Sequence, residues 1–175
     1  NLKNNRMKKN KPNILFILTD QQRRDSMKAY GNNWIKTPNL NNLSEKSFVF
    51  ENTYVTQPVC TPARASIMTG LYPQKTGLHR NNIPLDKNIQ TIGDLINEEY
   101  YNVHMGKWHL GDDMIAQHGF DKWIGIENSG GVRSTKKEYR YVESPYNKWL
   151  KSFDITPPET GKTYESWVGE ANLTE

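Results

Sequence analysis

The feature that most constrains the fold is an apolar run near the start of the chain, within Asn13–Thr19 (NILFILT). A strand with one face in water alternates apolar and polar residues, whereas this run is apolar without interruption. Such a run is typical of a strand buried on both faces of a parallel sheet. It ends at Asp20, where a polar stretch begins. We therefore predict a central parallel strand over 13–19.

Helix and strand signals alternate along the chain as far as residue 105. The predicted helices cover 38–46 after the Thr37-Pro38 start, 63–69 between Pro62 and Gly70, and 92–99 after the Thr91 cap. Further strands are predicted at Ser47–Val55 and Tyr101–Met105. This alternation favours an α/β fold with a mainly parallel sheet flanked by helices. In such sheets functional side chains collect beyond the carboxyl ends of strands, where Asp20, Lys107 and His109 fall.

The net charge of +4 comes from the first eleven residues, which contain five basic side chains and no acidic one. Residues 12–175 contain 18 basic and 19 acidic side chains, a net charge of −1. Nucleic-acid binding requires positive charge clustered on the folded part of a protein. We therefore interpret residues 1–11 as a flexible basic arm and exclude a nucleic-acid-binding function.

The apolar content is low for a self-contained domain, at 35% of residues with a mean hydropathy of −0.85. The polar surplus is greatest from about Ser129 onward, where the helix and strand signals end. A chain that buries so little of its own surface lacks part of its packing partner. No stretch approaches the ~20 apolar residues that cross a bilayer. The lysines after Met7 favour the cytoplasm over the periplasmic or secreted location that a removed leader would give.

The most informative segment is Val59–Gly70 (VCTPARASIMTG), which contains the only cysteine. It matches the signature Cys-x-Pro-x-Arg followed by four residues and Thr-Gly at every fixed position. Matching blocks occur in order at 19–21 (TDQ), 37–40 (TPNL), 69–73 (TGLYP) and 106–111 (GKWHLG). With these blocks the chain resembles the formylglycine-dependent (type I) sulfatases of the alkaline-phosphatase-like superfamily, over about residues 12–125.

The resemblance implies a fold and a domain organisation. We expect an incomplete alkaline-phosphatase-like α/β fold, with the N-terminal part of a catalytic domain at 12–128 and an irregular, truncated continuation at 129–175. The family's distal metal ligands and leaving-group acid find no match within residues 112–175. We therefore expect an enzyme as the full-length protein and no activity from this stretch alone.

The resemblance also implies the role of each catalytic residue. Cys60 would be oxidised by a maturation enzyme to formylglycine, whose hydrated form attacks the sulfur of a sulfate ester. Cys60 lies at the predicted start of a helix, where free N–H groups favour an anion. Arg64, about one helical turn further on, would reach the sulfate with its fixed charged fork. Lys107 would pair with the sulfate, and His109 would assist proton transfer.

The resemblance further implies a divalent metal, most often calcium, held by Asp20, Gln21 and the modified Cys60. Many relatives have two consecutive acids where this chain has Asp20-Gln21, so the site loses one negative charge but keeps an oxygen donor. Three readings stay open. The enzyme is a sulfatase for an aryl or carbohydrate sulfate, a phosphonate monoester or phosphodiester hydrolase of the same superfamily, or an inactive fragment.

Overall fold

The computed structural model of the chain describes residues 11–96, 99–126 and 133–155. The chain divides into two compact units, residues 1–53 and 54–175, and each is considered by itself. The arm predicted at 1–11 lies, apart from Lys11, outside the described residues. No helix in the described ranges has the length and apolar character to span a membrane.

The first unit contains one α-helix, α1 (Pro38–Glu45), and two short 3-10 helices, η1 (Arg24–Ser26) and η2 (Lys28–Tyr30). The helix predicted after Thr37-Pro38 is confirmed, with Pro38 as its first residue. The Thr37 hydroxyl donates to Asn41 Oδ1 at 2.9 Å and makes no cap to the backbone. The Tyr30 hydroxyl donates to the Phe50 carbonyl at 2.9 Å, which ties η2 to the segment that follows α1.

The strands predicted at 13–19 and 47–55 are wrong for this structure, because both segments lack strand hydrogen bonding. The apolar side chains of the first segment lie exposed, with Leu15 84% and Ile17 73% accessible. A parallel strand forms only when neighbouring strands accept and donate its ladder hydrogen bonds. No described residue supplies such a neighbour to either segment, so the pattern alone does not produce a strand.

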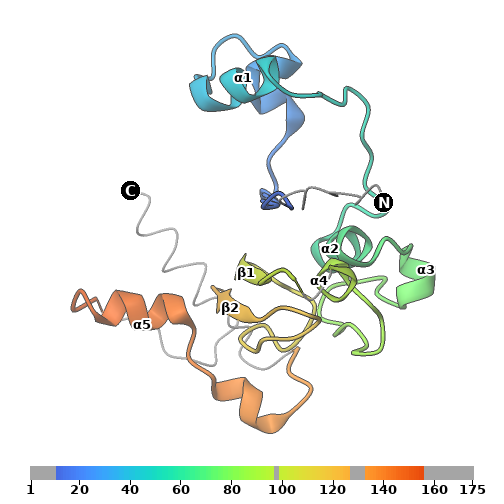
Figure 1. Cartoon of the computed structure of the whole chain (residues 1–175), viewed down its shortest axis with the longest axis vertical. Helices are drawn as coiled ribbons and strands as arrows, with labels where there is room; N and C mark the ends of the chain where they lie inside the picture. Colours follow the sequence, from blue (N-terminus) through green and yellow to red (C-terminus); the bar gives the residue numbers. More distant parts are fainter. Residues whose placement is uncertain (1–10, 97–98, 127–132, 156–175) are drawn as a thin grey trace, which may run out of the picture. The chain divides into compact units, whose positions relative to one another are not determined.

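The second unit is built around a small parallel sheet of β1 (Val103–Gly106) and β2 (Lys122–Gly125). Val103 pairs with Lys122, and Gly106 pairs with Gly125. Three helices, α2 (Cys60–Thr69), α3 (Pro73–Thr76) and α4 (Ile92–Leu95), lie on one side of this sheet (Figure 1). The parallel pairing and the flanking helices confirm the α/β class, and β1 confirms the strand predicted at 101–105.

The start of α4 shows how local sequence fixes an element. Thr91 and Asp94 form a capping box in which the Thr91 hydroxyl accepts from the Gly93 N–H and Asp94 accepts from the Thr91 N–H. The helix predicted at 92–99 ends at Leu95 in the described part, and residues 97–98 lie outside it.

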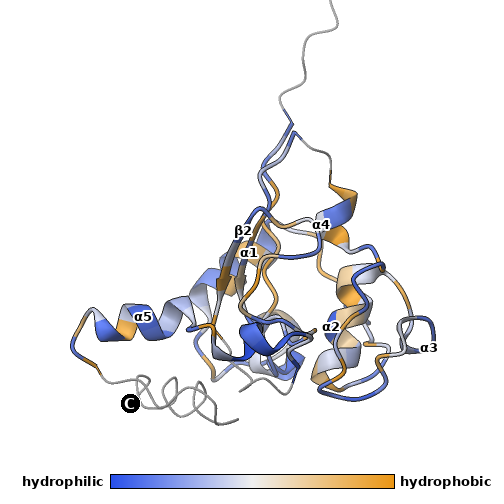
Figure 2. Ribbon diagram, turned by 90° about the horizontal axis from the view of Figure 1, so that it is seen from below, coloured by the Kyte–Doolittle hydropathy of each residue, from blue (hydrophilic) through white to orange (hydrophobic). Residues whose placement is uncertain are grey.

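The segment predicted to be irregular, 129–175, contains helices in its described part, 133–155. These are η3 (Lys137–Tyr141) and α5 (Pro145–Lys151). The Ser144 hydroxyl caps α5 by accepting from the Asn147 N–H at 3.0 Å. Helix α5 lies on the opposite side of the sheet from α2 and is mainly hydrophilic (Figures 1 and 2).

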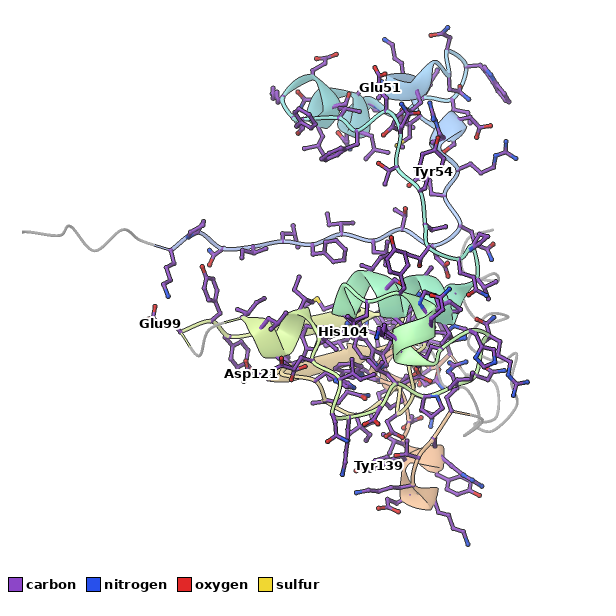
Figure 3. The ribbon with its side chains drawn as sticks, turned by 90° about the vertical axis from the view of Figure 1, so that its right-hand side faces the viewer. Glu51, Tyr54, Glu99, His104, Asp121 and Tyr139 are labelled. Carbon is purple, nitrogen blue, oxygen red and sulfur yellow. The ribbon has the colours of Figure 1, made fainter. Side chains whose placement is uncertain are left out.

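The core of the second unit joins α2 to the segment that follows β1. Its buried hydrophobic residues are Ala65, Met68, Leu78, Leu85, Trp108 and Leu110. Trp108, 1% exposed, makes edge-to-face contacts with His104, Phe120 and Trp123. His104 lies inside the unit, whereas Tyr139 lies near its periphery (Figure 3). Because Trp108 lies between Lys107 and His109 in sequence, burying it fixes the backbone that carries both residues.

Gly119 closes the turn that leads into β2, and nothing larger fits there. Its φ is +73°, and a Cβ at this position would meet the Gly93 carbonyl carbon at 2.4 Å. Asn102 joins the two glycines by donating to the carbonyls of Gly93 and Gly119 at 3.2 and 3.0 Å. The turn therefore packs backbone to backbone against α4.

We predict that Gly119→Ala destabilises the protein more than Gly77→Ala does. Gly77 has nearly the same left-handed φ, +75°, but no atom lies within 4 Å of its Cβ position. The left-handed conformation costs about 1–2 kcal/mol at both sites, and overpacking adds about 1–3 kcal/mol at Gly119 alone. Denaturant unfolding of the two variants measures the difference. Equal free energies of unfolding would contradict the close backbone contact.

Candidate active site

Helix α2 places Cys60 at its first residue. Val59 is extended (φ −135°, ψ 141°), and Gly70 ends the helix in the left-handed conformation. The sequence predicted a helix that starts after Pro62. In the structure the helix starts three residues earlier, at Cys60, so Pro62 is its third residue rather than the residue before it. Cys60 is therefore part of the first turn, half-buried, and in its free thiol form.

The N–H groups at the start of α2 are mostly occupied, contrary to the expectation that they are free for an anion. The Thr61 N–H donates to Asn81 Oδ1 at 3.0 Å, and the Ala63 N–H donates to the Val59 carbonyl at 3.0 Å. Pro62 has no N–H. Among the described residues this leaves the Cys60 N–H as the one open donor in the first turn. The positive charge near Cys60 therefore comes chiefly from side chains.

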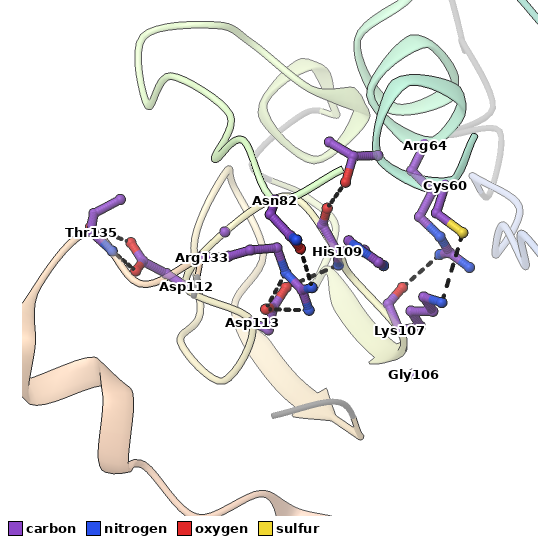
Figure 4. Close-up of polar contacts among 12 residues, drawn as sticks. Cys60, Arg64, Asn82, Gly106, Lys107, His109, Asp112, Asp113, Arg133 and Thr135 are labelled. Atoms are coloured by element: carbon purple, nitrogen blue, oxygen red, sulfur yellow. Dashed lines mark hydrogen bonds and ion pairs between the residues drawn. The ribbon is translucent and has the colours of Figure 1, made fainter. Parts of the chain in front are cut away.

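Two cationic side chains converge beside Cys60 (Figure 4). The Lys107 ammonium lies 4.0 Å from the Cys60 sulfur. The Arg64 guanidinium donates to the Lys107 carbonyl at 2.7 Å and is buried, with 7% of the residue exposed. Arg64 therefore adds charge and also fixes the backbone from which Lys107 extends. An anion beside the position 60 side chain would meet both cations.

His109 is buried and lies in a backbone conformation that is rare for residues other than glycine, with φ +61°. Its carbonyl accepts from the Thr61 hydroxyl at 2.9 Å, which ties it to the first turn of α2. Its N–H donates to Asp113 Oδ1 at 3.0 Å.

Behind His109 lies a buried ion pair that the sequence analysis missed. Arg133 donates to Asp113 Oδ2 through two nitrogens, each at 2.9 Å, and to Asn82 Oδ1 at 3.2 Å. Asp113 and Arg133 are only 6% and 4% exposed. The sequence held one signal, the adjacent acids Asp112 and Asp113, but pattern alone does not identify a partner twenty residues away.

Asp20 and Gln21, the predicted metal ligands, lie in the first unit. Both are exposed, and Gln21 has a φ of +51°. In the ranges that the structure describes, no three His, Cys, Asp or Glu residues gather closely enough to hold a metal ion. The pair does offer hard oxygen donors, a carboxylate and an amide, which suit calcium or magnesium. Two donors fall short of the 6–8 oxygens that calcium takes.

The remaining histidines have structural surroundings. Burial among aromatic rings lowers the pKa of His104, and Arg64 lowers it further, against the hydrogen bond to the Gly106 carbonyl. Burial also lowers the pKa of His118, although nearby Asp94 opposes this shift. His79 is exposed in a loop. None of the three was assigned to chemistry from the sequence.

The chain was compared with known protein families and with curated and solved proteins. The family model described as Sulfatase matches residues 12–164. The chain is 35% identical to an ulvan-active sulfatase of Formosa agariphila, over 88% of the chain and 32% of that protein. It is 34% identical to an N-acetylglucosamine-6-O-sulfatase of Bacteroides thetaiotaomicron, over 65% of the chain and 20% of that protein. The chain thus spans a third or less of the length of these relatives.

The fold agrees with that of a solved relative. A protein determined in complex with its substrate, D-glucosamine-2-N,6-O-disulfate, superposes with a TM-score of 0.60 at 33% identity. The match covers 70% of this chain and 24% of the solved one. The architecture is therefore part of the α/β fold of that family. The cysteine signature, the loop that follows β1 and these likenesses lead to one conclusion: the chain belongs to the sulfatase family.

Proposed function

We propose that the full-length protein hydrolyses sulfate esters of carbohydrates, with position 60 as the nucleophile after Cys60 is converted to formylglycine. The convergence of Lys107 and Arg64 on Cys60 is the observation that carries the proposal. A sulfate ester group carries one negative charge, which two neighbouring cations attract. The substrate class follows from the relatives, one named as ulvan-active and one solved with a sulfated glucosamine.

Each side chain then has a task that its contacts support. A formylglycine at position 60 would supply, when hydrated, one hydroxyl that attacks sulfur as the S–O bond to the sugar breaks and the sugar alcohol leaves with a proton. The second hydroxyl would then lose its proton and reform the aldehyde as sulfate leaves. Lys107, 4.0 Å from the Cys60 sulfur, binds a sulfate oxygen as a mobile point charge. Arg64 adds a second charge from a fixed position. His109 hydrogen-bonds the position 60 hydroxyl through its ring and takes or returns its proton.

A divalent metal would be held by oxygen atoms of Asp20, Gln21 and the modified residue 60. The donor chemistry of Asp20 and Gln21 fits a hard cation, most often calcium in this family. Such an ion would neutralise charge on sulfate oxygens. The other ligands would come from outside the described residues.

The direct test of the nucleophile is the chemistry of residue 60. Full-length protein co-expressed with a maturation enzyme should contain a position 60 peptide in which –CH₂SH has become –CHO, detected by mass spectrometry. Activity on glucosamine-6-O-sulfate should rise with the converted fraction, and Cys60→Ala should abolish it. Undiminished sulfatase activity with an unconverted cysteine would overturn the mechanism. Faster turnover of a phosphonate or phosphate ester would instead assign the alternative hydrolase function.

Lys107→Ala and His109→Ala should lower kcat of the converted, full-length enzyme without unfolding it. Each loses a group that faces charge in the transition state, which costs about 2–4 kcal/mol for one preorganised donor. Lys75→Ala, at an exposed lysine in α3, is the matched control and should leave kcat unchanged. Near-normal rates for both site variants, with formylglycine content verified, would remove these residues from the mechanism.

Asp20→Ala should weaken calcium binding to the full-length protein. One carboxylate supplies both a ligand and the negative charge that attracts a divalent ion. Residues 1–175 alone should bind calcium weakly, because two donors are too few. Calorimetric titration of the three proteins with calcium gives the affinities. Equal, tight binding by all three would show that the metal ligands lie elsewhere.

A further inference from the structure

Both backbone polar groups of His109 form hydrogen bonds, each to a different segment of the chain. Its carbonyl accepts from Thr61 on α2, and its N–H donates to Asp113. We propose that Asp113 and Arg133 are positioning residues, which set the backbone of His109 and thereby the direction of its ring toward residue 60. This inference rests on the proposed function, because it assigns His109 a part in catalysis.

The need for such a hold follows from the conformation of His109. A φ of +61° is unfavourable for a residue with a Cβ, so the isolated loop would relax to another conformation. Strained conformations persist where surrounding contacts over-determine them, and they cluster at functional sites. The Thr61 contact fixes the peptide plane after His109, and the Asp113 contact fixes the plane before it. Neither contact alone determines both φ and ψ.

The second step concerns what holds Asp113. Its carboxylate divides its two oxygens, with Oδ1 accepting from His109 and Oδ2 from Arg133. Two guanidinium nitrogens, Nε and Nη2, converge on Oδ2 and so fix the position of that oxygen. Asn82 in turn fixes one guanidinium nitrogen at 3.2 Å. The direction of the Oδ1 acceptor is therefore set by Arg133.

Burial makes this connection stiff. Both side chains of the ion pair are at most 4% exposed, so water does not compete for the carboxylate. In a site of low dielectric constant a charged acceptor binds an N–H more strongly than a neutral one does. If the ion pair served stability alone, Arg133 would be enough to pair with the buried Asp113 carboxylate. Here one of the two carboxylate oxygens is instead directed at a residue of the active site.

The test uses the full-length, formylglycine-containing protein and three substitutions. Asp113→Asn keeps one acceptor oxygen but turns an N–H₂ group toward either Arg133 or His109. Arg133→Lys keeps the charge and loses the pair of donors that converge on Oδ2. Asp112→Asn is the matched control, since Asp112 has the same charge in the same loop but accepts from Thr135 rather than His109. Asparagine tolerates the left-handed φ of Asp112, +47°.

The measurements are kcat and KM on glucosamine-6-O-sulfate, the unfolding temperature, and hydrogen exchange of the His109 amide. Asp113→Asn should lower kcat about tenfold to a hundredfold, the range for groups that orient an active-site side chain. KM should change much less, because Lys107 and Arg64 still bind the sulfate. The His109 amide should exchange at least about tenfold faster. Arg133→Lys should give a smaller change in the same direction, and Asp112→Asn should match the wild type.

Several outcomes would overturn the proposal. One is an unchanged kcat in folded Asp113→Asn and Arg133→Lys. Another is a loss of activity that only follows the loss of folded protein, or failure of both variants to fold, because the pair would then be a stability element. Hydrogen exchange separates this inference from the proposed function. An inactive wild type with a protected His109 amide would refute the catalytic role, whereas an active wild type with rapid exchange would refute the positioning.

Discussion

The active-site geometry depends on the contact between the first turn of α2 and the backbone that follows β1. Two side chains of α2 make it, the Thr61 hydroxyl to the carbonyl of His109 and the Arg64 guanidinium to the carbonyl of Lys107. Both contacts bind backbone rather than side chain, so they fix the chain path and leave the Lys107 ammonium and the His109 ring for other partners. Cys60 begins the same helix. One helical turn therefore carries the proposed nucleophile and also positions the loop that contains Lys107 and His109.

This arrangement gives the signature spacing a physical meaning. Arg64 lies four residues after Cys60, about one turn along α2, so both side chains emerge from the same face of the helix. Pro62, the third residue of the helix, removes one N–H from its first turn, and Asn81 occupies the N–H of Thr61. The helix end thus offers fewer free donors than the sequence suggested. Charge from Arg64 and Lys107 takes the place of those donors.

The sequence predicted the elements that local chemistry determines. The helices after Thr37-Pro38 and Thr91, and the helix containing Arg64, all form, because caps, prolines and glycines act within a few residues. The parallel pairing of the sheet was also predicted. The strand predicted at 13–19 does not form. An apolar run indicates that a segment is suited to burial, but it does not identify the neighbouring segments that would cover it. The chain spans about a third or less of the length of the relatives that it matches.

The candidate site likewise contains residues that local motifs identify and residues that only the tertiary structure brings together. Short motifs in the sequence allowed Cys60, Arg64, Lys107 and His109 to be proposed. The second unit places the Lys107 ammonium 4.0 Å from the Cys60 sulfur and the Arg64 guanidinium on the Lys107 carbonyl. Asp113, Arg133 and Asn82 were not found, because their association depends on tertiary structure alone.

Among the described residues, buried polar and charged side chains outnumber buried hydrophobic ones. A small apolar core repacks after substitution, whereas a directional hydrogen bond either keeps its geometry or loses it. The conformation of this loop is therefore determined by polar contacts to its backbone, and Trp108 anchors it through apolar packing between Lys107 and His109.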